Sequence, residues 1–349
     1  MKYIAQCPAG LQEVAANQLA ALGVIGLQLR LEEEGFLAFD AKCRPKDVSG
    51  LPYLNNVFGV VDDFNGKSLE LSQAIEQVLR KHAWIASAKR LVTPNERTFR
   101  LFLSDNGQLV GGDGGAVAAL INTLAEASGL QFSSRHADGE FWLIRRRNGR
   151  CFFAKRLSCR ARTEKTLEKG ELRPEFAHLL CLLSEPEEGD IFLDPFAGSG
   201  AIPFVRAQYP YEMIFIGDSN AEKIQRIKAT IKVGKKIRPR KGRPIITRVG
   251  DALALERFKD GFIHKVVTDP PWGMFDMEIT DLPRFYMRLI RELIRVTRSG
   301  GVIVLLVGDK EIANMLVHET TAKLVLAARY EVLVNGRKAS VLKWRRLAL

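Results

Sequence analysis

From Pro174 to the C-terminus, short apolar segments alternate with longer segments whose apolar residues recur at helical spacing. Consecutive parallel strands need a long crossover, usually a helix, so this alternation predicts a mostly parallel, doubly wound α/β sheet. The predicted strands span 191–193, 212–217, 245–249, 264–268, 301–307, 323–330 and 340–345. The predicted helices span 174–184, 199–208, 220–233, 282–297 and 310–318. Ligands of such sheets bind beyond the carboxyl ends of the strands, so the residues that follow each strand are the candidates for a site.

The residues before Pro174 show an α+β pattern instead. Strands are predicted at 2–7, 27–31, 35–40 and 57–64, with a helix at 11–22. A second group contains helices at 69–82 and 116–127, a strand at 98–104, and a strand pair at 141–146 and 151–157. Residues 158–175 are polar and charged, which is typical of a linker. The predicted regions are therefore 1–64, 65–158, a basic linker at 159–173, and 174–349. The glycine run 111–115 lacks the Lys-Ser or Lys-Thr ending of a phosphate-binding loop and is interpreted as a flexible loop.

The formal net charge of +12 is concentrated in two segments. Residues 145–165 hold nine basic residues against Glu164 alone, and residues 223–248 hold eleven basic residues and no acid. Most charge runs are solvated faces, but two runs this uneven favour a polyanionic partner. A membrane surface would need an amphipathic helix, which the prolines and glycine of 235–244 exclude. The residues predicted to contact the polyanion are Arg145, Arg146, Arg147, Arg150, Lys155, Arg156, Arg160, Lys235, Lys236, Arg238 and Arg240.

The first strand of the predicted sheet is followed by the string Asp-Pro-Phe-Ala-Gly-Ser-Gly at 194–200. Its two glycines let the chain turn sharply and let a ligand approach the backbone. The helix that begins near Ser199 offers free N–H groups, and the acid Asp194 suits a ligand that carries an ammonium group or hydroxyls. A bare Gly-x-Gly turn is as often structural, whereas the whole string is far more specific.

Carboxylates also follow the second and third strands. Asp218 comes 24 residues after Asp194, at the place where a carboxylate accepts both ribose hydroxyls in folds of this type. Asp251 follows the third strand and could accept a hydrogen bond from an adenine amino group. Each acid alone could be a helix N-cap, but acids at three successive strand ends are less easily explained in that way.

The fourth strand is followed by Asp269-Pro270-Pro271-Trp272-Gly273. Two successive prolines stiffen the backbone and remove two N–H donors, so that carbonyl groups are left to point outward. Asp269 and the Pro270 carbonyl can accept hydrogen bonds from an exocyclic amino group, and Trp272 offers a face on which an extruded base can stack. A rigid turn with a buried tryptophan is the structural alternative.

The C-terminal half resembles the S-adenosylmethionine-dependent methyltransferases that act on exocyclic amino groups of nucleobases. Their Asp/Asn-Pro-Pro-aromatic motif matches Asp269–Trp272, and their glycine-rich first motif matches Asp194–Gly200. With Leu172-Arg173-Pro174 upstream, the layout is similar to that of the THUMP-containing RNA guanine-N2 methyltransferases, and 137–158 is similar to the closing strand pair of a THUMP domain. Ala197 stands where that family often has cysteine, and Trp272 stands where tyrosine or phenylalanine is commoner.

This resemblance implies a Rossmann-like methyltransferase sheet at 174–349, preceded by a ferredoxin-like part at 1–64 and a THUMP-like RNA-binding domain at 65–158. It implies S-adenosyl-L-methionine as the cofactor and methylation of the N2 amino group of a guanosine in tRNA. The catalytic residues it implies are Asp269, Pro270, Pro271 and Trp272. The cofactor-binding residues it implies are Arg173, Asp194, Phe196, Ala197, Gly198, Ser199, Gly200, Asp218, Ser219, Asp251 and Ala252.

Other functions remain open at this point. Methylation of adenine N6 in RNA or DNA uses the same amino-group chemistry, and guanine-N2 methylation of ribosomal RNA uses the same pocket. A glutamine-methylating enzyme of release factors favours Asn-Pro-Pro-Tyr. A non-catalytic RNA-binding protein with this fold would be expected to lose Asp269 or the glycines 198 and 200, and all three are present.

Cysteine, histidine and hydropathy exclude several further classes. The five cysteines are odd in number and form no Cys-x-x-Cys pair, so we expect a reducing cytoplasm and no disulfide framework. The five histidines have no ligand spacing, and we expect no metal. No run of about 18 apolar residues occurs, so no membrane partner is expected. The N-terminus is interpreted as a first strand and not as a signal peptide. A monomer is expected, and the need for a small activating partner is left open.

Overall fold

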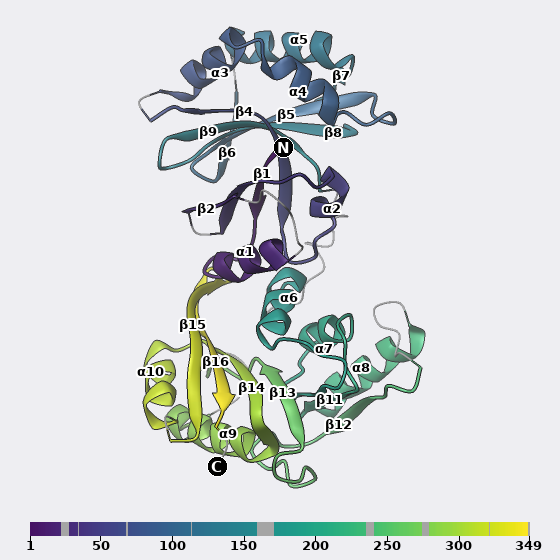
Figure 1. Ribbon diagram of the computed structural model, residues 1–349, viewed down its shortest axis with the longest axis vertical. Helices are drawn as coiled ribbons and strands as arrows, with labels where there is room; N and C mark the ends of the chain where they lie inside the picture. The colour runs from purple at the N-terminus through teal and green to yellow at the C-terminus, as the bar shows by residue number, and fades with distance from the viewer. Residues whose placement is uncertain are drawn as a thin grey trace. The chain divides into compact units, whose positions relative to one another are not determined.

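The computed structural model describes residues 1–21, 28–33, 35–67, 69–112, 114–158, 171–234, 241–273, 279–320 and 322–347 (Figure 1). The chain forms two compact units. The first unit contains Met1–Cys7 and Ala16–Ala161, and the second contains Pro8–Ala15 and Arg162–Leu349.

The first unit is built on a sheet of nine strands in its described part. The order is β2-β3-β1-β4-β9-β8-β5-β6, and β7 pairs with β5. β4 pairs with both β1 and β9, so one sheet crosses the boundary predicted between residues 64 and 65. The strands are β1 (Lys2–Gln6), β2 (Gln28–Glu33), β3 (Phe36–Asp40), β4 (Asn56–Asn65), β5 (Thr98–Asp105), β6 (Gln108–Val110), β7 (Gln131–Phe132), β8 (Gly139–Arg145) and β9 (Arg150–Arg156).

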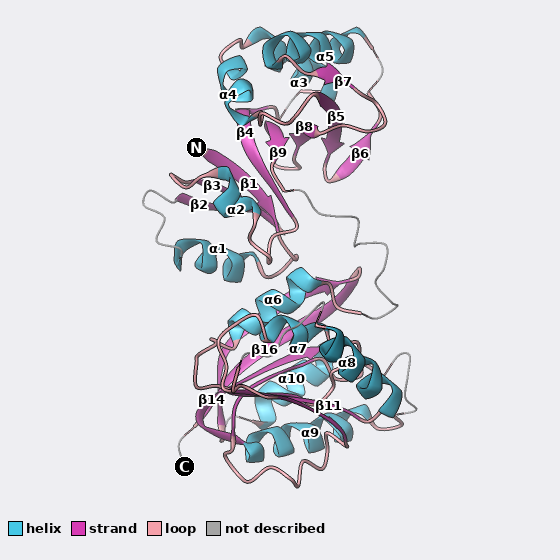
Figure 2. Ribbon diagram, turned by 90° about the vertical axis from the view of Figure 1, so that its right-hand side faces the viewer, coloured by secondary structure: helices cyan, strands magenta, loops and turns pink. Residues whose placement is uncertain are grey.

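Three helices cover one face of this sheet (Figures 1 and 2). They are α3 (Leu71–Arg80), α4 (Trp84–Leu91) and α5 (Gly115–Ser128), and their apolar sides share a core with β4, β5, β8 and β9. Trp84 lies in this core against the edge of the Phe153 ring. The remaining helices are α1 (Gln12–Ala21) and α2 (Pro45–Ser49). The short elements α2, α4, β6 and β7 were not among the sequence predictions, because segments of this length carry too little periodicity to be recognised.

The second unit has a sheet of seven strands in the order β12-β11-β10-β13-β14-β16-β15. β10 to β14 are parallel, and β16 is antiparallel to both of its neighbours. This confirms the predicted mostly parallel, doubly wound sheet. The strands are β10 (Ile191–Asp194), β11 (Met213–Asp218), β12 (Ile245–Val249), β13 (Ile263–Thr268), β14 (Thr297–Val307), β15 (Leu324–Val334) and β16 (Arg337–Arg346).

Helices lie on both sides of this sheet (Figure 2). One group comprises α6 (Pro174–Leu183), α7 (Ala201–Arg206) and α8 (Ala221–Val233). On the other side, α9 (Leu282–Val296) and α10 (Lys310–Glu319) pack against each other and bury their apolar faces in the core that contains β13 and β14. The side-chain carboxylates of Asp281 and Asp309 accept N–H groups of the first turns of α9 and α10, which explains where both helices begin.

The strand order creates a switch point between β10 and β13, which are neighbours in the sheet but not in sequence. The chain leaves β10 toward β11 and leaves β13 toward β14, so the two connections diverge at the carboxyl ends of these strands. In doubly wound sheets the crevice for ligands lies at such a point.

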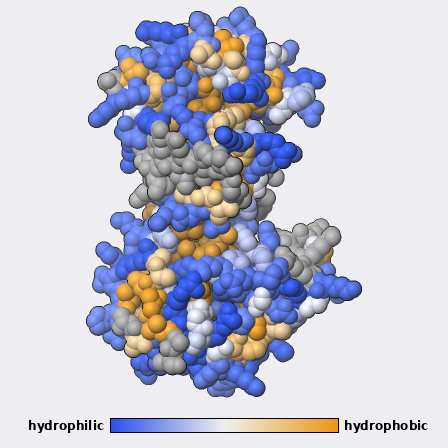
Figure 3. All heavy atoms as spheres, viewed as in Figure 1, coloured by the Kyte–Doolittle hydropathy of each residue, from blue (hydrophilic) through white to orange (hydrophobic). Residues whose placement is uncertain are grey.

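The surface visible in Figure 3 is mostly hydrophilic on both units. Large exposed apolar side chains of the second unit are scattered, and the most exposed of them are Val233, Val325, Val249 and Leu333. Within the described ranges, no helix has the length and apolarity needed to cross a membrane.

Candidate functional site

Four acidic residues lie along the carboxyl edge of the second sheet. Asp194 and Asp218 are the last residues of β10 and β11, Asp251 follows β12, and Asp269 follows β13. Because these strands are parallel, their carboxyl ends meet at one edge. The structure therefore brings together the strand-end acids singled out in the sequence.

Asp194 joins the two strands of the switch point. It is fully buried, and its Oδ1 accepts hydrogen bonds from the Thr268 hydroxyl at 2.7 Å and from the Phe196 N–H at 3.2 Å. Its Oδ2 has no hydrogen-bond partner among the described residues. Burial raises the pKa of Asp194 to about 8, and the nearby carboxylates of Asp269 and Asp218 act in the same direction. Thr268 was not among the predicted site residues, although it directly precedes Asp269.

The loop after β10 is held by Asp218. The Gly198 N–H donates to Asp218 Oδ2 at 2.9 Å, and the Asn220 N–H donates to Oδ1 at 2.9 Å. Gly198 and Gly200 have φ angles of +54° and +89°, in the left-handed region that glycine adopts without strain. Space is open where a Cβ of Gly198 would stand, whereas a Cβ at Gly200 would collide with the Phe204 ring at 2.8 Å. Gly200 is thus required by packing, and Gly198 leaves the backbone accessible.

A pocket opens beside this loop, between the ends of β11 and β12. Its apolar walls include Phe215, Leu255 and Phe258. Its polar lining includes Asp251 and the arginines 248 and 257. The Asp251 carboxylate accepts the Leu253 N–H at 2.8 Å, which fixes the first turn of the loop that forms one wall.

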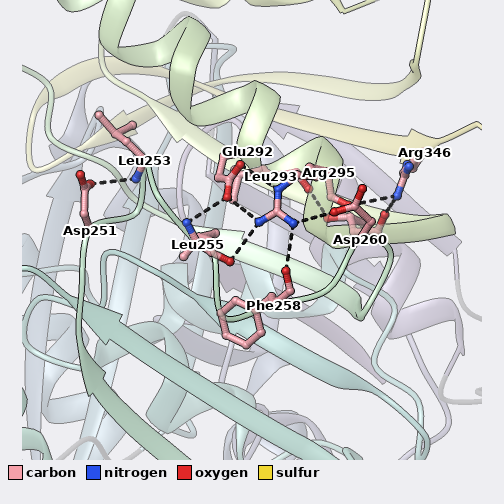
Figure 4. A network of polar contacts seen from close by, with 10 residues as sticks. Asp251, Leu253, Leu255, Phe258, Asp260, Glu292, Leu293, Arg295 and Arg346 are labelled. Atoms are coloured by element: carbon pink, nitrogen blue, oxygen red, sulfur yellow. Dashed lines mark hydrogen bonds and ion pairs between the residues drawn. The ribbon is translucent and has the colours of Figure 1, made fainter.

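A network around Arg295 ties that loop to α9 (Figure 4). The guanidinium donates to the carbonyls of Phe258 at 2.9 Å and Leu255 at 3.0 Å, and to the Asp260 carboxylate at 2.7 Å. It also pairs with Glu292 at 2.6 Å, and Glu292 accepts the Leu255 N–H at 2.9 Å. Hydrogen bonds to Glu292 and Asp260 raise the pKa of Arg295, so it stays charged. Glu292 and Arg295 were not among the residues predicted from the sequence. Their spacing in the sequence does not reveal that α9 is bonded to the loop that precedes β13.

The Asp269–Trp272 turn stands at the carboxyl end of β13. The Trp272 Nε1–H donates to Asp269 Oδ1 at 2.9 Å, and the Tyr286 hydroxyl donates to the Pro271 carbonyl at 3.1 Å. Within the described part of the chain, Trp272 is the one hydrogen-bond partner of the Asp269 side chain. Burial raises the pKa of Asp269 to about 7, and the bond from Trp272 opposes this shift. The carboxylate is thus held at one oxygen while the other stays available to a ligand.

Gly308 provides the surface against which the indole lies. A Cβ at this position would come within 2.1 Å of Cδ2 and 2.4 Å of Cγ of Trp272. Gly308 follows β14, the strand next to β13, so the indole is packed on the backbone of the neighbouring strand end. The sequence predictions missed Gly308, although a glycine directly after a strand of this sheet was a signal that could have been used.

Other predicted cofactor residues lie on the same elements. Phe196 packs near Phe285 of α9 with ring centroids 6.0 Å apart, and Ala197 and Ala252 are buried. Ser199 and Ser219 are exposed on their loops, and Arg173 is the exposed N-cap of α6. The roles of these residues in binding a cofactor stay predictions.

The basic residues of the β8–β9 pair are largely engaged by acids of their own unit. Arg145 pairs with Asp105 at 2.7 Å, and Arg150 pairs with Asp63 at 2.8 Å. Arg156 pairs with Glu140 at 3.1 Å. The Arg146 guanidinium stacks over the Phe36 ring at 4.4 Å, and Arg147 is exposed.

One of these residues corrects the sequence prediction. Lys155 is 2% exposed and its ammonium lies 2.6 Å from Glu96, so the prediction that it contacts a partner at the surface is wrong. The strand alternation places it on the face covered by helices, which its charge alone did not reveal. Arg160, Lys235, Lys236, Arg238 and Arg240 lie outside the described residues.

Residues 160–239 match the family model described as "RMKL-like, methyltransferase domain". This match falls almost entirely in the second unit. The tRNA (guanine(6)-N(2))-methyltransferase THUMP3 of Bos taurus is 32% identical over 148 residues, which are 40% of this chain and 29% of the relative. The chain thus matches less than a third of the length of the curated relatives.

Known structures share the fold of the whole chain. TrmN from Thermus thermophilus matches with a TM-score of 0.76 and 19% identity, over 99% of each chain. SMU.472, described as "a putative methyltransferase complexed with SAH", matches with a TM-score of 0.67 and 12% identity, over 100% of this chain and 98% of the other. These likenesses show that both units, the Rossmann-like sheet and the α/β unit that precedes it, have a known fold.

Proposed function

We propose that the protein transfers a methyl group from S-adenosyl-L-methionine to the N2 amino group of a guanosine in tRNA. The observation that carries the proposal is the Asp269 carboxylate at the switch point, with one oxygen held by Trp272 and the other available. An acceptor of this kind, followed by the Pro270 carbonyl, suits an amino group with two N–H donors.

The residues present fit this cofactor. The unpartnered, buried Asp194 Oδ2 and the accessible backbone at Gly198 suit a polar group that approaches the loop after β10. The pocket walled by Phe215 and Phe258 suits a flat heterocycle. We propose that this pocket holds the adenine beside Asp251, that Asp218 accepts the ribose hydroxyls, and that the loop with Arg173 holds the methionine part. When bound, the cofactor supplies a methyl group that is activated by a sulfonium.

The chain's own residues would act by positioning and by electrostatics. The lone pair of an exocyclic amino group is delocalised into the ring, so the nitrogen is a weak nucleophile. Hydrogen bonds to Asp269 and to the Pro270 carbonyl would draw the nitrogen toward a tetrahedral geometry and aim its lone pair. The nitrogen releases a proton when it gains the methyl group, and an Asp269 whose pKa is about 7 is suited to accept it.

The choice of tRNA and of guanine N2 is supported by the curated relatives, which are named as tRNA guanine-N2 methyltransferases. The resemblance of residues 65–158 to a THUMP domain points in the same direction. Adenine-N6 methylation is the second candidate, because the Asp-Pro-Pro-Trp turn presents the same acceptors to either base. We further propose that the protein acts as a monomer in the cytoplasm, where unmodified tRNA is available.

Labelled S-adenosylmethionine and unmodified bulk tRNA test the proposal. We expect labelled N2-methylguanosine after nuclease digestion, and label only in N6-methyladenosine would replace the guanine assignment by the adenine one. Asp269→Asn should abolish labelling, since an amide cannot accept the proton. Glu319→Gln, an isosteric change at the far end of α10, should leave labelling unchanged. Full activity of the Asp269→Asn protein would refute the role of this carboxylate.

A further inference from the structure

A stripe of exposed arginines runs along α9, outside both segments to which the sequence assigned the positive charge. Arg284, Arg288 and Arg291 are spaced four and three residues apart and are all exposed. The opposite face of α9 buries Tyr286, Leu289 and other apolar residues in the core. With a rise of about 1.5 Å per residue, the three side chains leave the helix along roughly 10 Å of its length. We call Arg284, Arg288 and Arg291 the α9 stripe.

The three arginines of the α9 stripe have no acidic partner among the described residues, unlike several other arginines of the structure. Within the described residues, none of its three guanidinium groups forms an ion pair or a side-chain hydrogen bond. Arg295, one turn further along the same side of α9, is instead bonded to Glu292 and Asp260 (Figure 4). Arg145 and Arg150 of the first unit are likewise paired. The positive charge of the α9 stripe is therefore directed at solvent.

This arrangement works against the stability of the helix itself. Like charges at spacings of three and four residues repel each other on a helix surface. Arg284 lies in the first turn, where the positive end of the helix dipole favours acids, yet that turn contains none. A stripe that weakens the helix and pairs with no acid among the described residues is explained by an external anion.

The α9 stripe begins beside the candidate site. The Tyr286 hydroxyl of α9 donates to the Pro271 carbonyl at 3.1 Å. The Phe285 ring lies 6.0 Å from that of Phe196 in the loop after β10. Both contacts fasten the first turns of α9 to Pro271 and to the loop after β10, so the stripe starts at the end of the helix that adjoins the candidate site.

We propose that the α9 stripe binds the phosphate backbone of the RNA substrate. Guanidinium groups donate two parallel hydrogen bonds to phosphate oxygens, which explains the presence of three arginines and no lysine on this face. Evenly spaced cations along a rod match a phosphate chain better than a compact anion. The inference deepens the proposed function and rests on it for the identity of the RNA.

The test compares two triple variants that remove equal charge. Arg284→Gln/Arg288→Gln/Arg291→Gln removes the α9 stripe, and Lys259→Gln/Lys323→Gln/Lys338→Gln removes three exposed lysines of the same unit. Binding of unmodified tRNA is measured across a range of salt concentrations. For the stripe variant we expect roughly tenfold weaker binding or more, and a slope of log affinity against log salt that is smaller by about 2–3. The lysine variant should change both quantities much less.

Two further measurements separate this role from a structural one and from the proposed function. Thermal unfolding of the stripe variant should occur at an equal or higher Tm, because repulsion has been removed. Its KM for tRNA should rise while its affinity for S-adenosylmethionine stays unchanged. The inference would be overturned if the arginine and lysine variants bound tRNA with equal affinity and with equal slopes of log affinity against log salt. This outcome would count against the stripe even if both variants were active methyltransferases. Absence of methyl transfer by the unaltered protein would refute the proposed function, whereas the binding comparison would still decide on the stripe.

Discussion

Gly308→Ala tests whether the indole of Trp272 must lie against the backbone after β14. The added Cβ would stand 2.1, 2.2 and 2.4 Å from three indole atoms, and real contacts of this kind are not shorter than 3.0 Å. Gly308 does not have a positive φ angle, so alanine itself fits the backbone there. The strain can be relieved only by moving Trp272, and a shift of about 1 Å or more breaks the 2.9 Å bond between its Nε1–H and Asp269.

Loss of the bond between Trp272 and Asp269 should slow the reaction and shift its pH dependence. A hydrogen bond to a charged group contributes about 1.5–3 kcal/mol, so losing it should slow the reaction roughly 10–100-fold at neutral pH. The same bond opposes the rise in the pKa of Asp269, which stands at about 7. Without it the pKa rises further, so the fraction of Asp269 in the acceptor form falls at pH 7. Activity should then recover as the pH is raised, through a profile displaced toward alkaline values.

The assay is the rate of methyl transfer to saturating tRNA between pH 6 and 9, with Gly189→Ala as the matched control. Gly189 has space for a Cβ and no positive φ, so its replacement should leave the rate unchanged. In Gly308→Ala/Trp272→Ala the collision is absent, and the double variant should be no slower than Trp272→Ala alone. A Gly308→Ala protein with the original rate and the original pH profile would refute the reasoning.

Two more predictions concern groups outside the reacting centre. Arg295→Ala should raise the KM for S-adenosylmethionine several-fold with little change in kcat, because the pocket wall that contains Leu255 and Phe258 loses its hydrogen bonds to α9. Titration of the cofactor by calorimetry measures the affinity. An unchanged affinity would contradict the prediction. Arg206→Ala should destabilise the second unit by about 3–5 kcal/mol. Arg206 and Asp190 are 0% and 1% exposed, and their side chains lie 2.7 Å apart. The substitution would therefore leave a buried carboxylate without its guanidinium partner. Urea unfolding measures the loss, and a change below 1 kcal/mol would show that the buried pair is not stabilising.

The position of the site could be predicted from sequence because it depends on a repeated pattern. An acid ends β10 and β11, an acid follows β12 and β13 within two residues, and the carboxyl ends of parallel strands meet at one edge. Asp194, Asp218, Asp251 and Asp269 follow from that rule alone. The contact of Trp272 with Gly308 does not, since it joins the ends of two strands and depends on a side-chain rotamer.

The electrostatic role of the arginines could not be predicted, because it depends on strand register. Asp105 and Arg145 are 40 residues apart and become neighbours only when β5 pairs with β8. That pairing converts part of the apparent basic segment 145–165 into internal ion pairs.

The spacing of α9 is visible in the sequence as arginines at 284, 288, 291 and 295, but spacing alone does not distinguish a solvent-facing arginine from one that is bound. Arg295 is not available to an external anion, because its guanidinium is bonded to Glu292 and to carbonyl groups of the loop that precedes β13. The net charge of +12 is therefore a poor guide to where a polyanion binds. The better guide is which cations folding leaves without an acid. Among the described residues near the candidate site, these include Arg248 and Arg257 of the pocket and the α9 stripe.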